Sequence, residues 1–322
     1  MFRLGLIRMK FRRVLLVLIF TFISFSSAQA VWIWTPQTGK FINPKWSVKS
    51  TPKAQLEYGL AFLEGRKYNE AISEFKKLIR HYPRAKEAPE AQYYTGKVYE
   101  ELNKPYEAYK AYQVVIDKYP FSELAGEIVE LEYQIGNQIL EGRNKQGKWV
   151  EMFVGNERVI EIFRTVIKNA PYGKFAALSQ YKIGLYLKEK GLYDEARDEF
   201  EKTMNDFPNS EWAKAAQFQI AMADTNRSSN AQHEQKITQQ AIDGFKEFVK
   251  SHPESELTPQ AKQQIVRLRD KEAENNFLIA QYYEKQKNFK AAAIYYSVII
   301  DKYNDTKFGP KAMMRLKVVG TK

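Results

Sequence analysis

Polar and apolar residues follow a helical period through most of the chain after residue 50. Within residues 68–79, apolar side chains stand at Ala71, Ile72, Phe75, Leu78 and Ile79. This spacing of three and four residues places them on one face of a helix, with Lys and Glu on the other face. The pattern predicts an amphipathic helix that packs against a neighbour.

The same pattern recurs along the chain at fixed offsets. In the first unit Gly59 is followed by Ala71 twelve residues later, by Phe75 four after that and by Pro83 eight further on. Two units, the third and fifth, keep only the second half of the pattern. The equivalent residues are Gly96, Ala108, Tyr112 and Pro120, then Val159, Phe163 and Pro171, then Gly184, Ala196, Phe200 and Pro208, then Ala241, Phe245 and Pro253, and finally Ala280, Ala292, Tyr296 and Asn304.

Each unit is typical of two helices joined by a turn. The small residues let the helices approach closely, the aromatic ring fills the gap between them, and proline ends the second helix. Small, aromatic and proline positions at set offsets define the tetratricopeptide repeat, and an ordinary helical bundle would not keep this register. The sequence therefore predicts an all-α tetratricopeptide-repeat superhelix of about six helical pairs.

Stacked pairs of this kind present a concave face lined by their first helices, which suits an extended peptide. Tyr93 and Tyr181 fit this groove and the packed core equally well. The candidate groove residues are Leu56, Leu60 and Leu63 in the first unit, Tyr93, Lys97 and Glu100 in the second, and Tyr181, Leu185 and Lys188 in the fourth.

Residues 1–30 have the composition of a secretory signal peptide. Five Arg and Lys residues and no acid occur in residues 1–13, an apolar run covers residues 14–25, and Ala28-Gln29-Ala30 follows. We expect cleavage after Ala30. The alternative is an uncleaved anchor, but twelve helical residues reach only about 18 Å of a bilayer core of about 30 Å.

The amino-acid composition limits the kinds of site and activity that the chain can have. The 322 residues carry a formal charge of +12 and contain no cysteine, so disulfides, thiolate metal sites and cysteine-linked lipid are excluded for this sequence. Its three histidines are far apart, and no catalytic or phosphate-binding motif occurs. We expect no enzymatic activity, no catalytic residue, no metal and no cofactor, and export argues against nucleic acid as a partner.

Segments outside the repeats divide the chain further. Residues 31–50 form an aromatic segment in which a turn at residues 35–39 separates two short strands, with Trp32 and Trp34 on one face. These rings either dock on the first repeat or bind another protein or a membrane interface. We expect an N-terminal repeat module at 51–175 and a C-terminal one at 176–322.

Four further segments carry expectations of their own. We expect surface loops at residues 141–153 and 225–235, and one long helix from residue 259 to 277 that extends into the sixth unit. The chain after Asp305 is basic and without acids; it is either solvated or meets anionic lipid or an acidic partner.

Three stretches resemble the BamD-like outer-membrane protein assembly factors. They are residues 68–75 with His81-Tyr82-Pro83, residues 148–163 with Asn169-Ala170-Pro171, and residues 268–285. The resemblance covers most of residues 51–305, and its more specific parts are the interrupted third unit and the long linking helix.

The resemblance implies a non-enzymatic periplasmic scaffold, peripheral to the outer membrane, that binds unfolded outer-membrane proteins and a BamA-like barrel-assembly subunit. Family members commonly carry a lipidated cysteine; here none exists, so we expect attachment through partners. The alternative is a periplasmic repeat adaptor for cell-envelope or cell-division enzymes. The carried-over candidates are Leu60, Tyr93 and Lys97 for the unfolded substrate, Arg269, Asp270 and Lys271 for the barrel subunit, and Trp32 and Trp34 for attachment.

Overall fold

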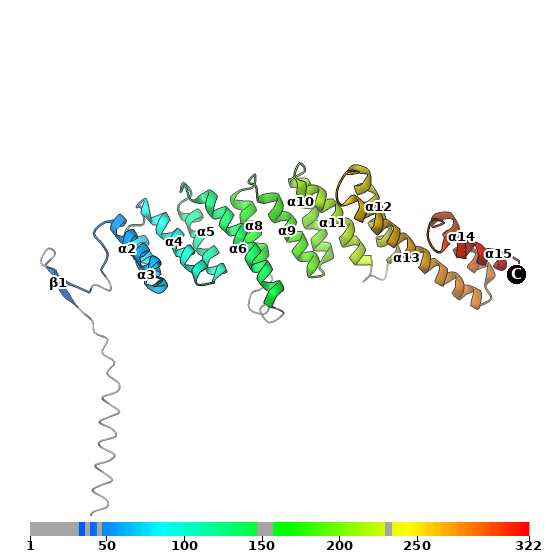
Figure 1. Cartoon of the computed structure of the whole chain (residues 1–322), viewed down its shortest axis with the longest axis horizontal. Coiled ribbons are helices and arrows are strands. Elements are labelled where there is room, and N and C mark those ends of the chain that lie inside the picture. The colour runs from blue at the N-terminus through cyan, green and yellow to red at the C-terminus, as the bar shows by residue number, and fades with distance from the viewer. Residues whose placement is uncertain (1–31, 36–38, 44–46, 147–156, 229–233, 322) are drawn as a thin grey trace, which may run out of the picture. The chain divides into compact units, whose positions relative to one another are not determined.

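Helices make up almost all of the described chain. A computed structural model describes residues 32–35, 39–43, 47–146, 157–228 and 234–321, and the predicted signal peptide at 1–30 lies outside them. Within these residues the structure is helical except for one two-stranded sheet, which confirms the all-α prediction (Figure 1). The helices are α2 (Pro52–Glu64), α3 (Tyr68–His81), α4 (Glu87–Glu101), α5 (Pro105–Lys118), α6 (Ala125–Gln146), α8 (Glu157–Asn169), α9 (Ala176–Glu189), α10 (Tyr193–Asp206), α11 (Glu211–Ser228), α12 (Glu234–Ser251), α13 (Thr258–Lys285), α14 (Phe289–Lys302) and α15 (Gly309–Val319).

Consecutive helices pack as pairs that follow the predicted repeat units. Helices α2–α3, α6–α8, α9–α10, α11–α12 and α13–α14 contact each other, and α4 contacts α5 through Gln92, whose side-chain amide donates to the Ala111 carbonyl. The described residues thus contain the six expected helical pairs, with α15 after the sixth. The fold is a tetratricopeptide-repeat array.

In several pairs, the second helix is followed directly by an aromatic residue. Tyr82, Tyr119 and Phe207 follow α3, α5 and α10, each with a non-helical backbone and an N–H that bonds to the carbonyl four residues earlier. Proline comes next in all three cases. Since a residue before proline is disfavoured in the helical region, the chain must leave the helix there.

The turn inside four pairs uses one left-handed residue at a constant register position. Arg66, Asn103, Gly191 and Lys287 have φ values of 55°, 53°, 77° and 59°. Each lies seven residues after the small residue of its first helix. Only one of the four is glycine, the residue that adopts this conformation without strain.

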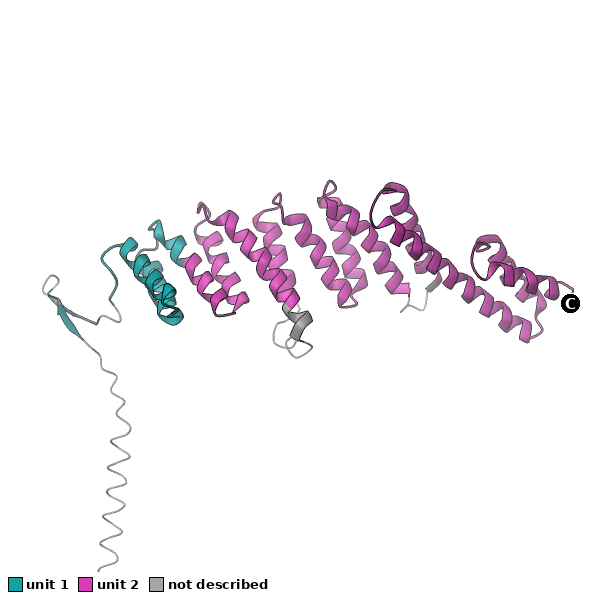
Figure 2. Cartoon of the chain, in the orientation of Figure 1, with its two compact units in different colours: residues 1–91 teal, residues 92–322 magenta. Residues whose placement is uncertain are grey.

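Packing divides the chain into two compact units, residues 1–91 and 92–322, shown in teal and magenta in Figure 2. The division falls within α4. The expected boundary between modules at residues 175 and 176 stays a prediction, and side chains on both of its sides share one hydrophobic cluster in the second unit.

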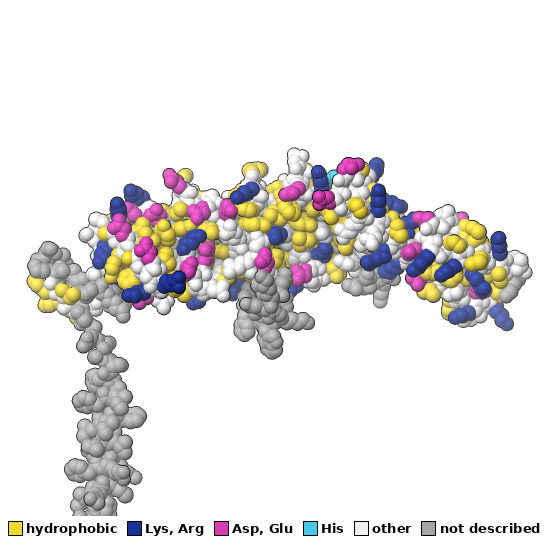
Figure 3. All heavy atoms as spheres, in the orientation of Figure 1, with side chains coloured by type: hydrophobic (Ala, Val, Ile, Leu, Met, Phe, Trp, Pro, Cys, Tyr) yellow, Lys and Arg dark blue, Asp and Glu magenta, His cyan; other side chains and the backbone are white. Residues whose placement is uncertain are grey.

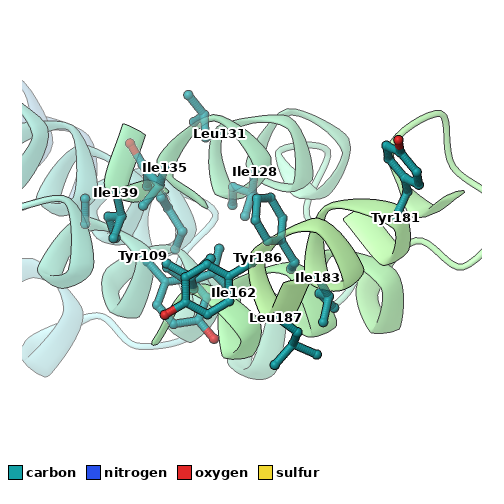
Figure 4. Close-up of a cluster of buried hydrophobic side chains, with 14 of the residues drawn as sticks. Tyr109, Ile128, Leu131, Ile135, Ile139, Ile162, Tyr181, Ile183, Tyr186 and Leu187 are labelled. Carbon is teal, nitrogen blue, oxygen red and sulfur yellow. The ribbon is translucent and has the colours of Figure 1, made fainter. Parts of the chain in front are cut away.

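That cluster is the main core of the second unit. Figure 4 shows isoleucines of α6 and α8 packed with tyrosines and leucine of α5 and α9. Two smaller clusters follow: Phe218, Phe245 and Leu268 belong to one, and Tyr296 and Phe308 belong to the other. Helix α13 supplies buried residues to both smaller clusters. The predicted long linking helix is therefore confirmed and runs unbroken for 28 residues.

The first residues of both expected surface loops are helical. Helix α6 continues to Gln146, and α11 continues to Ser228. Residues 147–156 and 229–233 lie outside the described residues. At the polar end of α11, the hydroxyls of Thr225 and Ser228 donate to the carbonyls of Ala221 and Thr225, so both buried hydroxyls find acceptors inside the helix.

Candidate functional site

In the first four repeats, a glycine of the first helix lies directly against an aromatic ring of the second helix. In the fourth pair, a Cβ on Gly184 would lie only 2.6 Å from Phe200 Cε1. In the first pair, a Cβ on Gly59 would lie 2.5 Å from Phe75 Cε1. No larger side chain fits without a shift. This contact sets how far each first helix projects from its partner.

An aromatic residue three positions before the small residue packs on the same ring. The centroids of Tyr93 and Tyr112 are 5.7 Å apart, and those of Tyr181 and Phe200 are 5.6 Å apart. Tyr93 and Tyr181 are each only 8% exposed. Both rings are therefore packed in the core of their helical pairs, and their hydroxyls bond to side chains of other helices.

The Tyr93 hydroxyl is part of an acidic cluster on α4 and α6. Tyr93 donates to Glu127, and Tyr112 donates to Glu100 over 2.7 Å. The Lys97 ammonium lies 3.6 Å from Glu100 and 5.4 Å from the centre of the Tyr93 ring. Burial, and then the hydrogen bonds to carboxylates, raise the pKa of Tyr93 and of Tyr112. The cluster offers two carboxylates and one lysine to a ligand.

A second polar cluster joins α9 and α11. Lys188 donates to the Gln219 side-chain oxygen, and the Gln219 amide donates to the Tyr181 hydroxyl over 3.3 Å. The Tyr181 ring also packs on Trp212, at a centroid distance of 5.3 Å. The structure thus brings together two of the three predicted groove residues of the fourth unit.

The predicted groove residues of the first unit lie on α2. Leu56 is buried, while Leu60 and Leu63 are partly exposed. Tyr58 of the same helix is 40% exposed and carries the Lys49 ammonium 4.0 Å from its ring centre. Leu60 and Leu63 keep apolar surface accessible, whereas Leu56 serves packing in its own helical pair.

The aromatic N-terminal segment forms the predicted hairpin. Strand β1 (Ile33–Thr35) pairs antiparallel with β2 (Lys40–Ile42), with Trp34 opposite Phe41. These two rings are 5.1 Å apart at their centroids. Trp32, Trp34 and Phe41 are 60%, 51% and 63% exposed. The hairpin therefore presents three aromatic side chains to solvent.

The predicted partner residues on α13 face the turn before α15. Arg269 donates to the Lys302 carbonyl over 2.8 Å, forms an ion pair with Asp305 and lies over the Tyr303 ring. Asp270 accepts from the Lys307 backbone N–H at 3.3 Å. Lys271 is half-buried. Arg269 and Asp270 thus have a structural task within the sixth unit.

Several polar residues of the first helices were missed in the sequence. Glu132 of α6 is fully buried and accepts hydrogen bonds from Gln113 and Asn169. Burial raises the pKa of Glu132 to about 7, partly opposed by those two hydrogen bonds. A register signal existed: Glu132 lies four residues before Gly136, where other units have glutamine. Glu127 and Gln219 had no such signal.

The described residues contain no group of three or more His, Asp or Glu side chains placed to hold a metal ion. Among those same residues, no helix is both long and apolar enough to cross a membrane. Figure 3 shows Lys and Arg side chains gathered over the end of the second unit that contains α13 to α15.

Comparisons with known proteins agree with the repeat geometry. The family model described as outer membrane lipoprotein (YfiO) matches residues 220–319. Tetratricopeptide-repeat models match residues 56–123 and 178–210. The chain is thus a tetratricopeptide-repeat protein, a class of helical scaffold that binds other proteins.

One curated relative makes the resemblance more specific. The outer membrane protein assembly factor BamD of Caulobacter vibrioides is 24% identical over 188 residues, which is 58% of this chain and 58% of that protein. The match thus spans less than two thirds of the relative. With the family-model match, it confirms the resemblance inferred from the sequence: the chain is a BamD-like repeat protein.

Solved structures with similar folds are distant in sequence. A TPR repeats protein from Bacteroides fragilis is 14% identical, with a TM-score of 0.45, and the match covers 68% of this chain and 98% of that chain. The C-terminal part of a TPR repeat-containing protein from Cytophaga hutchinsonii is 16% identical, with a TM-score of 0.36, covering 81% and 87%.

Proposed function

We propose that this protein is a non-enzymatic scaffold of outer-membrane β-barrel assembly, acting in the periplasm at the inner surface of the outer membrane. The observation that carries the proposal is the outer membrane lipoprotein (YfiO) match over residues 220–319, which covers the long linking helix and the sixth pair. The BamD relative supports the same role. In this role the chain binds unfolded barrel proteins and a BamA-like subunit.

The proposed substrate contacts lie on the first helices of the N-terminal repeats, and each helix is considered by itself. Leu60 and Leu63 offer apolar surface on α2. Lys97 and its carboxylate neighbour Glu100 offer polar contacts on α4. An unfolded barrel strand alternates apolar and polar side chains, so it carries side chains that suit either helix.

The partner site of the proposal lies on α13, at Arg269, Asp270 and Lys271. Because Arg269 and Asp270 already bind the turn after α14, a partner would engage them together with that turn. Trp32 and Trp34 of the hairpin would assist attachment, since exposed tryptophan favours membrane interfaces and protein interfaces alike.

Site-specific photo-crosslinking in cells tests both contacts. A photo-reactive amino acid at position 97 should capture unfolded barrel proteins, and one at position 271 should capture the BamA-like subunit. Position 250, an exposed lysine of α12, serves as the control and should capture neither. Equal capture at all three positions, or no capture at 97 and 271, contradicts the proposal.

The alternative function is a periplasmic adaptor for cell-envelope or cell-division enzymes. The repeat array is equally compatible with it, because helical repeats serve many partners. The same crosslinking separates the two, since recovery of a cell-wall synthase in place of a barrel subunit supports the adaptor.

A further inference from the structure

The outer face of α15 carries large apolar side chains. On its inner side, the helix packs Ala312 and Val319 into the hydrophobic cluster of the sixth pair. On its outer side Met313, Met314 and Val318 are exposed, Met314 by 64%. A helix that packs on one side and faces water on the other ordinarily carries polar residues on the water side. Exposed apolar side chains gathered on so short a helix therefore indicate an interaction surface.

Lysines on and next to α15 carry charge that no acid neutralises. The chain from residue 306 onward contains no Asp or Glu. Arg315 is paired with Glu284 of α13. Figure 3 shows Lys and Arg side chains beside hydrophobic ones over this end of the second unit. Within the described part of the chain, no ion pair is formed by the ammonium groups of Lys307, Lys311 and Lys317.

Two of these lysines lie over one aromatic ring. The Lys307 ammonium is 5.2 Å and the Lys311 ammonium 5.1 Å from the centre of the Phe308 ring. The ring attracts each cation, but the two like charges repel each other. An anion beside both ammonium groups would relieve this repulsion through charge-assisted hydrogen bonds, and a phosphate group has the oxygens to form them.

The order of charged and apolar positions favours a lipid surface over a protein. Lys317 lies one helical turn from both Met313 and Met314, so a charge stands among the apolar side chains. The centre of a protein interface is depleted of lysine, because burying the charge is costly. At a membrane interface, the lysine stem lies along apolar surface while its ammonium reaches the head groups. A second copy of the chain would bring the same unpaired lysines against one another.

We propose that the outer face of α15 binds a membrane surface rich in anionic phospholipid. Lys307 and Lys311 contact lipid phosphates, and Met313, Met314 and Val318 enter the boundary between head groups and acyl chains. Methionine is unbranched and flexible, so it adapts to disordered chains. This binding goes beyond the function proposed above and does not depend on it, since neither an unfolded substrate nor a barrel subunit takes part.

Vesicle binding tests the proposal. The chain is purified after export and mixed with vesicles of phosphatidylcholine, either alone or with about one third phosphatidylglycerol, and co-sedimentation gives each affinity. The anionic vesicles should bind at least about tenfold more tightly, because each lysine near the surface adds to the attraction. High salt should weaken this preference. Equal affinity for both vesicles overturns the proposal, and so does binding to neither, which leaves an acidic protein as the occupant.

Charge variants locate the contact. The preference for anionic vesicles should disappear in the triple variant Lys307→Gln, Lys311→Gln and Lys317→Gln. A matched control changes the net charge equally at exposed lysines of α3, α11 and α12 and should keep the preference: Lys76→Gln, Lys214→Gln and Lys250→Gln. A preference that survives the α15 variant in a folded chain, judged by an unaltered circular dichroism spectrum, overturns the proposal.

Trp34→Ser separates this face from the exposed aromatic hairpin. The hairpin variant should keep the preference for anionic vesicles, because the lysines of α15 are intact. Loss of the preference in Trp34→Ser, together with its retention in the α15 variant, would place the lipid contact at the hairpin and overturn the proposal.

A single fluorescent label tests the apolar contact. Because the sequence contains no cysteine, Met314→Cys gives one labelling site. An environment-sensitive fluorophore there should shift its emission to the blue on anionic vesicles, since the side chain leaves water. The same label at Lys214→Cys, an exposed position of α11, should not shift. Binding without a shift at position 314 would contradict the insertion of the methionines.

Discussion

Gln180 binds Glu199 twice: its side-chain amide donates to the Glu199 carboxylate over 2.6 Å and to the Glu199 backbone carbonyl over 3.3 Å. Gln55 repeats both bonds with Glu74 in the first pair. Each glutamine lies four residues before the glycine of its first helix. The third pair holds Glu132 at this position, a carboxylate where an amide is the rule.

Glu132→Gln should stabilise the protein above neutral pH. Because the pKa of Glu132 is about 7 in the folded chain and near 4.5 ordinarily, the folded state binds the proton more tightly. Stability from this group is therefore present at low pH and is lost as the pH rises from about 4.5 through 7. The glutamine side chain carries no charge, so the substitution should raise the free energy of unfolding at pH 8 by roughly 1–3 kcal/mol.

Thermal unfolding at pH 5 and pH 8 checks this expectation. The gain in Tm should be larger at pH 8, because the buried Glu132 of the wild type is ionised there. The hydrogen bonds at this position can be kept in the variant, because Gln113 or Asn169 can turn its side-chain amide to accept from the amide of the new glutamine. Glu130→Gln, on the same helix but exposed and paired with Lys174, should show no such pH dependence. A pH-independent effect of Glu132→Gln would mean that Glu132 stays ionised.

Gly184→Ala should destabilise the fourth pair by about 1–3 kcal/mol, because the new methyl group overlaps the Phe200 ring. Gly126 of α6 is the matched control: a Cβ there meets nothing within 4 Å, so Gly126→Ala should stabilise by roughly 0.5–1 kcal/mol. Urea denaturation measures both. Adding Phe200→Leu to Gly184→Ala should recover part of the loss; no recovery would contradict the steric account.

Lys287→Gly should stabilise the α13–α14 turn by about 1 kcal/mol, because glycine adopts a positive φ without the penalty borne by lysine. Gly191→Ala, at the equivalent turn of the fourth pair, should destabilise by a similar amount. Hydrogen exchange in α14 and α10 reports each effect locally. Slower exchange in the Gly191→Ala variant would contradict the strain argument.

Arg269→Ala should loosen the turn between α14 and α15 without unfolding α13. The arginine holds the Lys302 carbonyl and Asp305, and its hydrogen bond lowers the pKa of Asp305. Amide exchange in α15 should accelerate, whereas Arg267→Ala, an exposed position on the same helix, should leave it unchanged. In the wild type, the exchange protection factors in α15, which correct for the slower intrinsic exchange of amides in acid, should also fall as the pH drops and Asp305 becomes protonated.

The repeat register could be predicted from the sequence because it depends on the sizes of side chains at fixed spacings. Gly184 and Phe200 lie at fixed offsets, so spacing alone predicted the helical pairs, whereas a stretch free of glycine and proline after Pro259 predicted the long helix α13. Contacts between side chains of different helical pairs could not be predicted in the same way. Lys188 and Gln219 come from different pairs, and no pattern in either helix marks the contact.

Two kinds of error have a local physical cause. Composition predicted a loop from Thr225, yet Thr225 and Ser228 are buried within α11, where their hydroxyls bond to carbonyls of the same helix. The left-handed turn residues also escaped notice, because Arg66 and Lys287 are not the residue types that ordinarily mark that conformation.

The 28-residue helix α13 has a mechanical consequence. Its first half packs Ala261 and Leu268 into one cluster, and its second half packs Ala273 and Ala280 into the next. A continuous helix of this length is a stiff rod of about 42 Å. A rotation of the sixth helical pair therefore also rotates the part of α13 that packs in the fifth pair, because α13 contains no break at which it could bend.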